Sequence, residues 1–325
     1  MIPTLQSLRF VFVMMIVMSH FGYRGCPAFD AGGDCGVAFF FVLSGFALSL
    51  GYGRRIGDGT FSYRAFMRRR LLKLYPLHLL CLLLFLLLFH AKETIDVRLV
   101  FNALLLQSWV PDSNYYFSYN GVSWFLSCLL FLYAVFPWAY RLANRFTLAV
   151  VVVLCAAAYV LVPYHQVNAV LYVNPLVRFA DFFFGIMLCK ACQRQAAEKG
   201  RPAFHGWAEV LLTLLLVVLL AAYPYVDAKL RNAPLYWLVI LPLLAVFARQ
   251  AGPLSRLLQW RPLLWLGSLS MPIFLVHPIV FRALFHFFPA MPYMAMLALG
   301  LTVIVALSWA IDRCFLKPVE ALRKN

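Results

Sequence analysis

Arg9 and His20 are two polar side chains within one long apolar segment, and their residue types suggest chemistry. Eleven helical steps give a rise of about 16 Å and a net rotation of about 20°, so both side chains share one stripe of a helix. Only apolar residues and Ser19 separate them. In lipid both groups are costly, so they must face protein or a water-filled cavity. Removal from water favours the neutral imidazole, which can act as a general base or a nucleophile. The alternative is a packed histidine bonded to a neighbouring carbonyl.

A basic cluster follows in the segment RRIGDGTFSYRAFMRRRLLKLYP, which we expect to be a loop. The cluster consists of Arg68, Arg69, Arg70 and Lys73. The guanidinium fork of arginine suits phosphate because it donates hydrogen bonds in pairs. We expect an anion site here for a large, phosphate-bearing cosubstrate, or else ordinary charge that only sets the membrane topology.

Further polar residues lie in other apolar segments. Arg178 and Asp181 in NPLVRFADFFFGI are three residues apart, so they are neighbours on a helix and can pair. They predict either a structural ion pair or a polar wall for an incoming acceptor. Weaker candidates for binding substrate, each more typical of packing on its own, are Ser44, Trp124, Tyr133 and His277.

The elements that must position these residues are apolar helices. The chain has 325 residues, of which 64% are hydrophobic and 12% are charged, which is too apolar for a soluble domain. A membrane-spanning helix needs about 20 mostly apolar residues. We predict an all-α polytopic membrane bundle, one domain over 1–325, with about ten transmembrane helices: 6–22, 36–53, 71–91, 121–140, 146–163, 175–193, 206–224, 234–249, 263–285 and 291–315. The first segment carries Arg9 and no basic leader, so we expect it to be retained rather than cleaved as a signal peptide.

The distribution of charge predicts the orientation of this bundle. The net charge is +16, with 28 Lys and Arg residues. If the N-terminus is inside and ten helices alternate, 20 of these 28 residues fall on the inner side. This asymmetry predicts both termini in the cytoplasm. It also argues against nucleic acid as a partner, because the excess positive charge is mostly a topology signal.

The cysteines divide between the two sides. Cys26 and Cys35 fall in the first outer loop, where they either form a disulfide in an oxidising compartment or remain thiols. Cys189 and Cys192 form CKAC at an inner helix end. Zinc sites of this type usually need a second pair of ligands, and the sequence offers no evident one, so we predict no metal.

Taken together, these segments resemble acyltransferase family 3, the integral-membrane O-acyltransferases of envelope glycans. LQSLRFVFVMMIVMSHF resembles the first helix of the family, in which an Arg is followed by ten residues and a His. GVAFFFVLSGFALS, RRRLLKLYP, NPLVRFADFFFGI and LGSLSMPIFLVHP resemble later family motifs in the same order. Lys73 stands where Arg is more usual, and Asp181 where Glu is common. Leu129 and Leu130 replace acidic residues that the family often carries, so no carboxylate can act there.

The resemblance implies an acyl-CoA donor, usually acetyl-CoA, on the cytoplasmic side and a glycan or lipid-linked glycan hydroxyl as acceptor on the outer side. His20 would activate that hydroxyl or briefly carry the acyl group, and Arg9 would orient the donor. We expect a multi-pass protein of the inner membrane in contact with membrane lipids. We expect no fused esterase-like domain. The alternative is a transporter or flippase for a lipid-linked glycan, although no inverted repeat with broken helices is visible.

Overall fold

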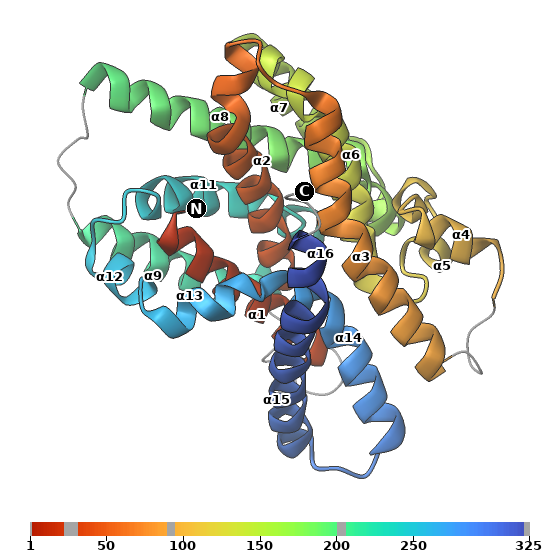
Figure 1. Cartoon of the computed structure of the whole chain (residues 1–325). Coiled ribbons are helices and arrows are strands. Elements are labelled where there is room, and N and C mark those ends of the chain that lie inside the picture. The colour runs from red at the N-terminus through yellow and green to blue at the C-terminus, as the bar shows by residue number, and fades with distance from the viewer. Residues whose placement is uncertain (1, 23–31, 90–94, 200–205, 322–325) are drawn as a thin grey trace.

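The computed structural model describes residues 2–22, 32–89, 95–199 and 206–321, which form helices and connecting turns with no strand among them. Seven helical stretches in this part are long and apolar enough to cross a membrane. They contain α1 (Pro3–Gly22), α2 (Gly33–Gly57), α3 (Tyr63–Phe89), α6 (Trp124–Leu142), α11 (Pro234–Phe247), α14 (Ser270–Phe287) and α15 (Tyr293–Ile311) (Figure 1). The predicted class, a membrane helix bundle, agrees with this architecture. The count of ten spans and the location of the termini stay predictions.

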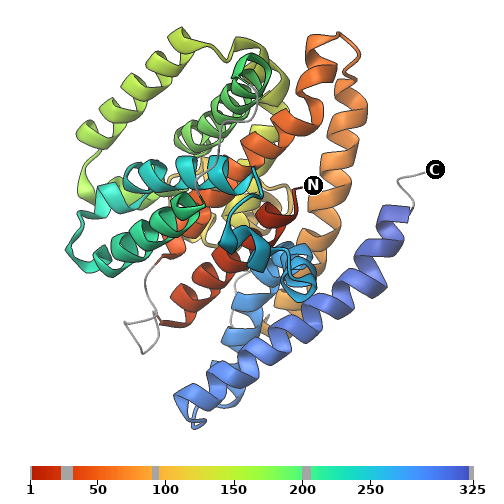
Figure 2. The ribbon, with the colours of Figure 1, turned by 90° about the vertical axis from the view of Figure 1, so that its left-hand side faces the viewer.

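The other segments predicted to cross the membrane are helical too. They contain α7 (Arg145–Leu161), α8 (Pro175–Lys199) and α9 (Trp207–Ala221). The chain bends by 117° between α7 and the following segment Tyr164–Tyr172. If these two are counted as one broken span, the described residues contain eight candidate spans. Figure 2 shows α7 and α15 at opposite edges of the bundle. Leu161 at the end of α7 is 77% exposed, as expected of a helix that faces lipid.

Short helices fill the connections between these segments. They are α4 (Val97–Ala103), α5 (Ser113–Tyr116), α10 (Ala228–Arg231), α12 (Pro253–Leu258), α13 (Arg261–Ser268) and α16 (Lys317–Ala321). Two of them fix the start of α1. The Thr4 hydroxyl also donates to the Phe247 carbonyl at the end of α11, at 2.6 Å, and the Ser7 hydroxyl donates to the Leu258 carbonyl at the end of α12. The Gln6 amide donates to the Leu264 carbonyl of α13 at 2.8 Å.

Two predicted boundaries are wrong. The basic segment is not a loop, because α3 begins at Tyr63 and carries the whole cluster. Arg, Met and Leu favour helix, and the Ser62 hydroxyl accepts the Ala65 N–H at 3.4 Å beside the first turn. The predicted helix 263–285 is broken at Leu269 into α13 and α14. The break lets α13 pack against α1, where Gly267 lies directly on the Gln6 carbonyl.

The helices α2 and α8 cross with their backbones in contact. A Cβ atom added at Gly45 would overlap the Phe182 carbonyl, and one added at Gly185 would overlap the Val42 carbonyl. Each glycine therefore accommodates the backbone of the other helix, which is the close approach that small residues allow in membrane bundles. This crossing fixes α2 against α8 and so positions the residues that α2 presents to the centre of the bundle.

Candidate active site

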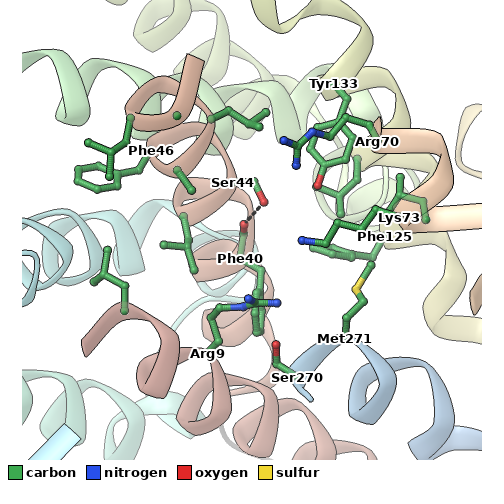
Figure 3. A pocket seen from close by; sticks show the side chains of 18 of the residues that line it. Arg9, Phe40, Ser44, Phe46, Arg70, Lys73, Phe125, Tyr133, Ser270 and Met271 are labelled. Carbon is green, nitrogen blue, oxygen red and sulfur yellow. Dashed lines mark hydrogen bonds between the residues drawn. The ribbon is translucent and has the colours of Figure 1, made fainter. Parts of the chain in front are cut away.

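One pocket, which we call the basic pocket, has a volume of about 420 Å³ and lies among α1, α2, α3, α6 and α14. Arg9, Arg70 and Lys73 line it, and Figure 3 shows all three side chains directed into the same space. No Asp or Glu belongs to the described residues of its lining. A partly apolar cavity with three cationic groups suits an anion attached to an apolar arm.

The basic cluster of α3 divides between pocket and solvent. Arg70 and Lys73 are three residues apart and so lie on one face of α3, and both line the pocket. Arg68 and Arg69 are exposed and do not line it. The guanidinium of Arg70 donates to the Tyr52 hydroxyl at 3.0 Å. The cofactor-binding prediction therefore concentrates on Arg70 and Lys73.

Three hydroxyl groups complete the polar lining of the basic pocket. The Ser44 hydroxyl donates to the Phe40 carbonyl at 2.7 Å, and Tyr133 lies beside both Ser44 and Arg70. Ser270 lies with Arg9 at one end of the pocket (Figure 3). Leu129 contributes an apolar wall. Ser44 and Tyr133, which we predicted as substrate-binding, thus line the basic pocket, and their contact with substrate stays a prediction.

The second pocket, which we call the histidine pocket, has a volume of about 630 Å³ and is lined by His20, Asp34 and Trp124 among others. Tyr172 and Tyr223 contribute aromatic rings. The Tyr223 hydroxyl donates to the Asp34 carboxylate at 3.4 Å. A pocket of this size with aromatic walls and a few polar groups suits a small ligand or one unit of a larger one.

The two pockets lie at opposite ends of α1 and α2. Arg9 from the first half of α1 lines the basic pocket, and His20 from its last turn lines the histidine pocket. On α2 the order is reversed, since Asp34 in the first turn lines the histidine pocket and Tyr52 near the end lines the basic one. The stripe predicted for Arg9 and His20 therefore connects two cavities rather than lining one.

The hydrogen bonds of His20 determine which nitrogen can act as a base. Its Nδ1 lies 2.8 Å from the Ile16 carbonyl. A carbonyl oxygen only accepts, so Nδ1 carries the hydrogen, and Nε2 is the unprotonated nitrogen of the neutral ring. The His20 side chain is exposed within the pocket. Nε2 is therefore the nitrogen of the neutral His20 ring that can take a proton as a general base.

His277 lies directly beside His20. The two rings meet edge to face with centroids 4.9 Å apart and an interplanar angle of 73°. His277 is fully buried and is absent from the described lining of both pockets. Its Nδ1 donates to the Ile273 carbonyl at 3.2 Å. The structure therefore places His277 where it holds the His20 ring, and direct contact with substrate stays a prediction.

Arg178 and Asp181 form a buried ion pair behind the histidine pocket. The Arg178 Nη1 atom lies 3.0 Å from the Asp181 carboxylate, and their side chains are 0% and 1% exposed. Arg178 also donates to the carbonyls of Tyr172 at 2.6 Å and Asn232 at 2.8 Å. The Trp237 indole donates to Asp181. Neither charged residue lines the described pockets, so the geometry gives the pair a structural role, and its contact with acceptor stays a prediction.

Several residues of the two pockets escaped the sequence analysis. Asp34 precedes the predicted start of the second helix, at 36, and so fell in a loop. Tyr172 ends the π-helical segment Val167–Tyr172 and Arg231 ends the short helix α10, and segments of four to six residues are too short to show a helical hydrophobic period. A carboxylate in the first turn of an apolar helix was the available signal for Asp34. Cys26 lies outside the described residues and Cys35 is buried, so a disulfide between them stays a prediction.

Comparison with known proteins relates this chain to a family of acyltransferases. A family model described as an acyltransferase domain matches residues 2–313. "Acyltransferase MdmB" of Streptomyces mycarofaciens is 38% identical over 120 residues, which are 35% of this chain and 30% of that protein. "Putative peptidoglycan O-acetyltransferase YrhL" of Bacillus subtilis (strain 168) is 25% identical over 310 residues, which are 85% of this chain and 48% of that protein.

The chain spans less than half the length of the curated relatives that it matches. No solved structure matches it. The family model nevertheless covers nearly all of the sequence and includes the helices that line both pockets. The chain therefore belongs to acyltransferase family 3.

Proposed function

We propose that this membrane acyltransferase transfers an acyl group, in the first instance acetyl, from acyl-CoA in the cytoplasm to a hydroxyl of an extracytoplasmic or lipid-linked glycan. In a bacterial cell the protein would lie in the cytoplasmic membrane. The observation that carries the proposal is the pair of pockets at the two ends of α1, one basic and one presenting His20. The chemistry of the two substrates matches these two environments.

The basic pocket suits the donor. Coenzyme A carries phosphates on a long arm, and Arg70 and Lys73 offer positive charge beside an apolar cavity. Arginine binds phosphate oxygens in pairs and lysine binds them as a point charge. Arg9 and Ser270 lie at one end of the cavity, where they would orient the donor.

The histidine pocket suits the acceptor. Trp124 and Tyr172 supply ring faces, and Asp34 supplies hydrogen-bond acceptors for hydroxyl groups. Rings of this kind pack against the apolar face of a sugar while polar groups bind its edge. The word peptidoglycan in the name of the Bacillus relative is in keeping with a glycan acceptor.

The transfer itself needs one base. The acceptor hydroxyl donates to Nε2 of His20, and its oxygen attacks the thioester carbon as the proton moves to the imidazole. The carbon–sulfur bond then breaks, and the sulfur takes the proton from the imidazolium. General-base assistance of this kind contributes about 10²–10⁴-fold in rate. In the alternative route Nε2 attacks the thioester carbon first, the carbon–sulfur bond breaks, and coenzyme A leaves as the thiolate. The acceptor hydroxyl then attacks the acyl-imidazole, the carbon–nitrogen bond breaks, and the hydroxyl proton goes to the thiolate.

Coenzyme A release tests the proposal. The purified protein in detergent receives acetyl-CoA and soluble peptidoglycan fragments, and free thiol and fragment-bound acetyl ester are measured. His20→Ala should lose at least about 10²-fold in rate. His286→Ala is the matched control, because His286 is an exposed histidine of α14 that lines neither described pocket. Near-full transfer by His20→Ala contradicts the proposed role, and glycan movement without thioester consumption would identify a transporter instead.

A further inference from the structure

One face of α14 runs from the basic pocket to the histidine pocket. Ser270 lines the basic pocket and Pro278 lines the histidine pocket. Between them lie Phe274 and His277, at helical spacings that keep all four residues on one side of the helix. Of the described residues, Phe274 alone lines both pockets. Its ring is therefore a shared wall between the donor side and the acceptor side.

This wall is aromatic and well packed. Phe274 is 5% exposed, and its ring centroid lies 5.1 Å from that of Phe125 and 6.1 Å from that of His277. Phe125 in turn meets Phe40 with ring centroids 6.4 Å apart. Phe40 and Phe125 line the basic pocket, whereas Trp124, next to Phe125 in sequence, lines the histidine pocket. The apolar end of the donor cavity is thus built from phenylalanine rings.

The backbone beside this wall lacks one regular helical hydrogen bond. Pro278 has no N–H to donate to the Phe274 carbonyl four residues earlier, so the regular helical bond is missing there. The His277 imidazole lies beside that carbonyl and the Ile273 carbonyl. The ring that divides the pockets and the imidazole that contacts His20 are therefore held by the same helical turn.

We propose that Phe274 limits the length of the acyl chain that the enzyme transfers. The inference rests on the proposed function, since the donor must bring its thioester from the basic pocket to His20. The acyl group is the tip of the donor and meets the Phe274 ring first. A short acyl group fits beside the Phe274 ring. Each methylene added to the acyl chain must push the ring aside. Apolar pockets discriminate by about 10–200-fold for one methylene.

Replacement of Phe274 enlarges the end of the donor cavity. The surrounding structure fills only part of the space left by a large-to-small change in a core. Phe274→Ala should therefore admit longer acyl chains, and Phe274→Leu should do so to a smaller extent. Phe281→Ala is the matched control, because Phe281 lies on the same helix, is 4% exposed and lines neither described pocket.

The test compares acetyl-, butyryl- and hexanoyl-CoA as donors with soluble peptidoglycan fragments as acceptor. We measure kcat/KM for thiol release and, separately, the Kd of each acyl-CoA by calorimetry. The hexanoyl-to-acetyl ratio should rise about tenfold or more in Phe274→Ala, rise less in Phe274→Leu and stay unchanged in Phe281→Ala. If Phe274→Ala does not fold, Phe274→Leu decides.

The failure of this inference differs from failure of the proposed function. A wild-type protein that neither binds nor consumes any acyl-CoA contradicts the proposed function. A wild-type protein that transfers acetyl, together with folded Phe274 variants that keep the wild-type chain-length profile, overturns the inference alone. An equal shift in Phe281→Ala also overturns it, because a general loosening of α14 would then explain the change.

Discussion

Arg70 and Arg68 have the same chemistry and lie on the same helix, but they differ in what surrounds them. Arg70 faces the basic pocket and Arg68 is exposed. A hydrogen bond to a charged group contributes about 1.5–3 kcal/mol, which corresponds to roughly 10–100-fold in binding. Arg70→Gln and Lys73→Gln should each raise the donor KM by about that factor and leave the acceptor KM unchanged. Steady-state kinetics with varied acetyl-CoA measures this.

Arg68→Gln is the control for this prediction. It removes the same charge from the same helix without changing the described lining of the pocket, so the donor KM should stay near the wild-type value. An equal effect of all three changes would mean that the cluster acts only through general surface potential. That effect would also weaken steeply with added salt, because exposed charges are screened.

Residue types alone predicted part of this site. The spacing of Arg9 and His20 was sufficient to place them on one stripe, since α1 is an uninterrupted helix. The division of the basic cluster was not predicted, because we treated the segment as a loop, in which no helical face exists. Phe274 gave no signal, since one phenylalanine among 30 becomes a shared wall only through the packing of α14 against α1 and α3, which places its ring between the two pockets.

At the scale of elements, the crossing of α2 and α8 depends on two glycines. Gly45→Ala or Gly185→Ala forces a methyl group into the backbone of the other helix. Overpacking of this kind costs about 1–3 kcal/mol, so each variant should lower the melting temperature of the purified protein in detergent. Gly57→Ala at the end of α2 is the control, because nothing lies within 4 Å of a Cβ there. Equal melting temperatures for Gly45→Ala and Gly57→Ala would contradict the close crossing.

The ion pair of α8 joins three further elements. Arg178 binds carbonyls of the segment before α8 and of the turn before α11, and Asp181 binds Trp237 of α11. Removing one partner of a buried pair costs about 3–5 kcal/mol, because the other charge is left uncompensated. Arg178→Gln and Asp181→Asn should each lower yield and melting temperature, and the double variant should recover part of the loss. Normal folding with lost turnover in both single variants would instead place the pair on the acceptor path.

The helices themselves were predictable because apolar runs of sufficient length leave few alternatives in a membrane protein. The break at Leu269 was not predictable in the same way. It depends on α13 packing across the start of α1, where Gly267 contacts the Gln6 backbone. Tertiary contacts of this kind join residues about 260 positions apart in sequence, and no local pattern reports them.

At the scale of the whole molecule, the proposed roles of the two pockets require one orientation of the protein in the membrane. The donor is made in the cytoplasm, so the proposal requires the basic pocket, with the start of α1 and the end of α2, to lie on that side. The turn between α2 and α3 then lies inside, and the connection that holds α4 and α5 lies outside. The excess of Lys and Arg predicted for the inner side favours the same orientation.

Two matched serines test this orientation. Ser62 lies just before α3, and Ser113 is the first residue of α5, and both are exposed. Each is replaced by cysteine in a background in which Cys26 and the exposed Cys314 are serine. In intact cells a membrane-impermeant thiol reagent should label Ser113→Cys strongly and Ser62→Cys only after the cells are opened. The reverse pattern would place the basic pocket outside, away from the cytoplasmic acyl-CoA, and the donor assignment of Arg70 and Lys73 would fall with it. Equal labelling of both sites in intact cells would mean that the turn and the connection share one side, which contradicts α3 as a single membrane span.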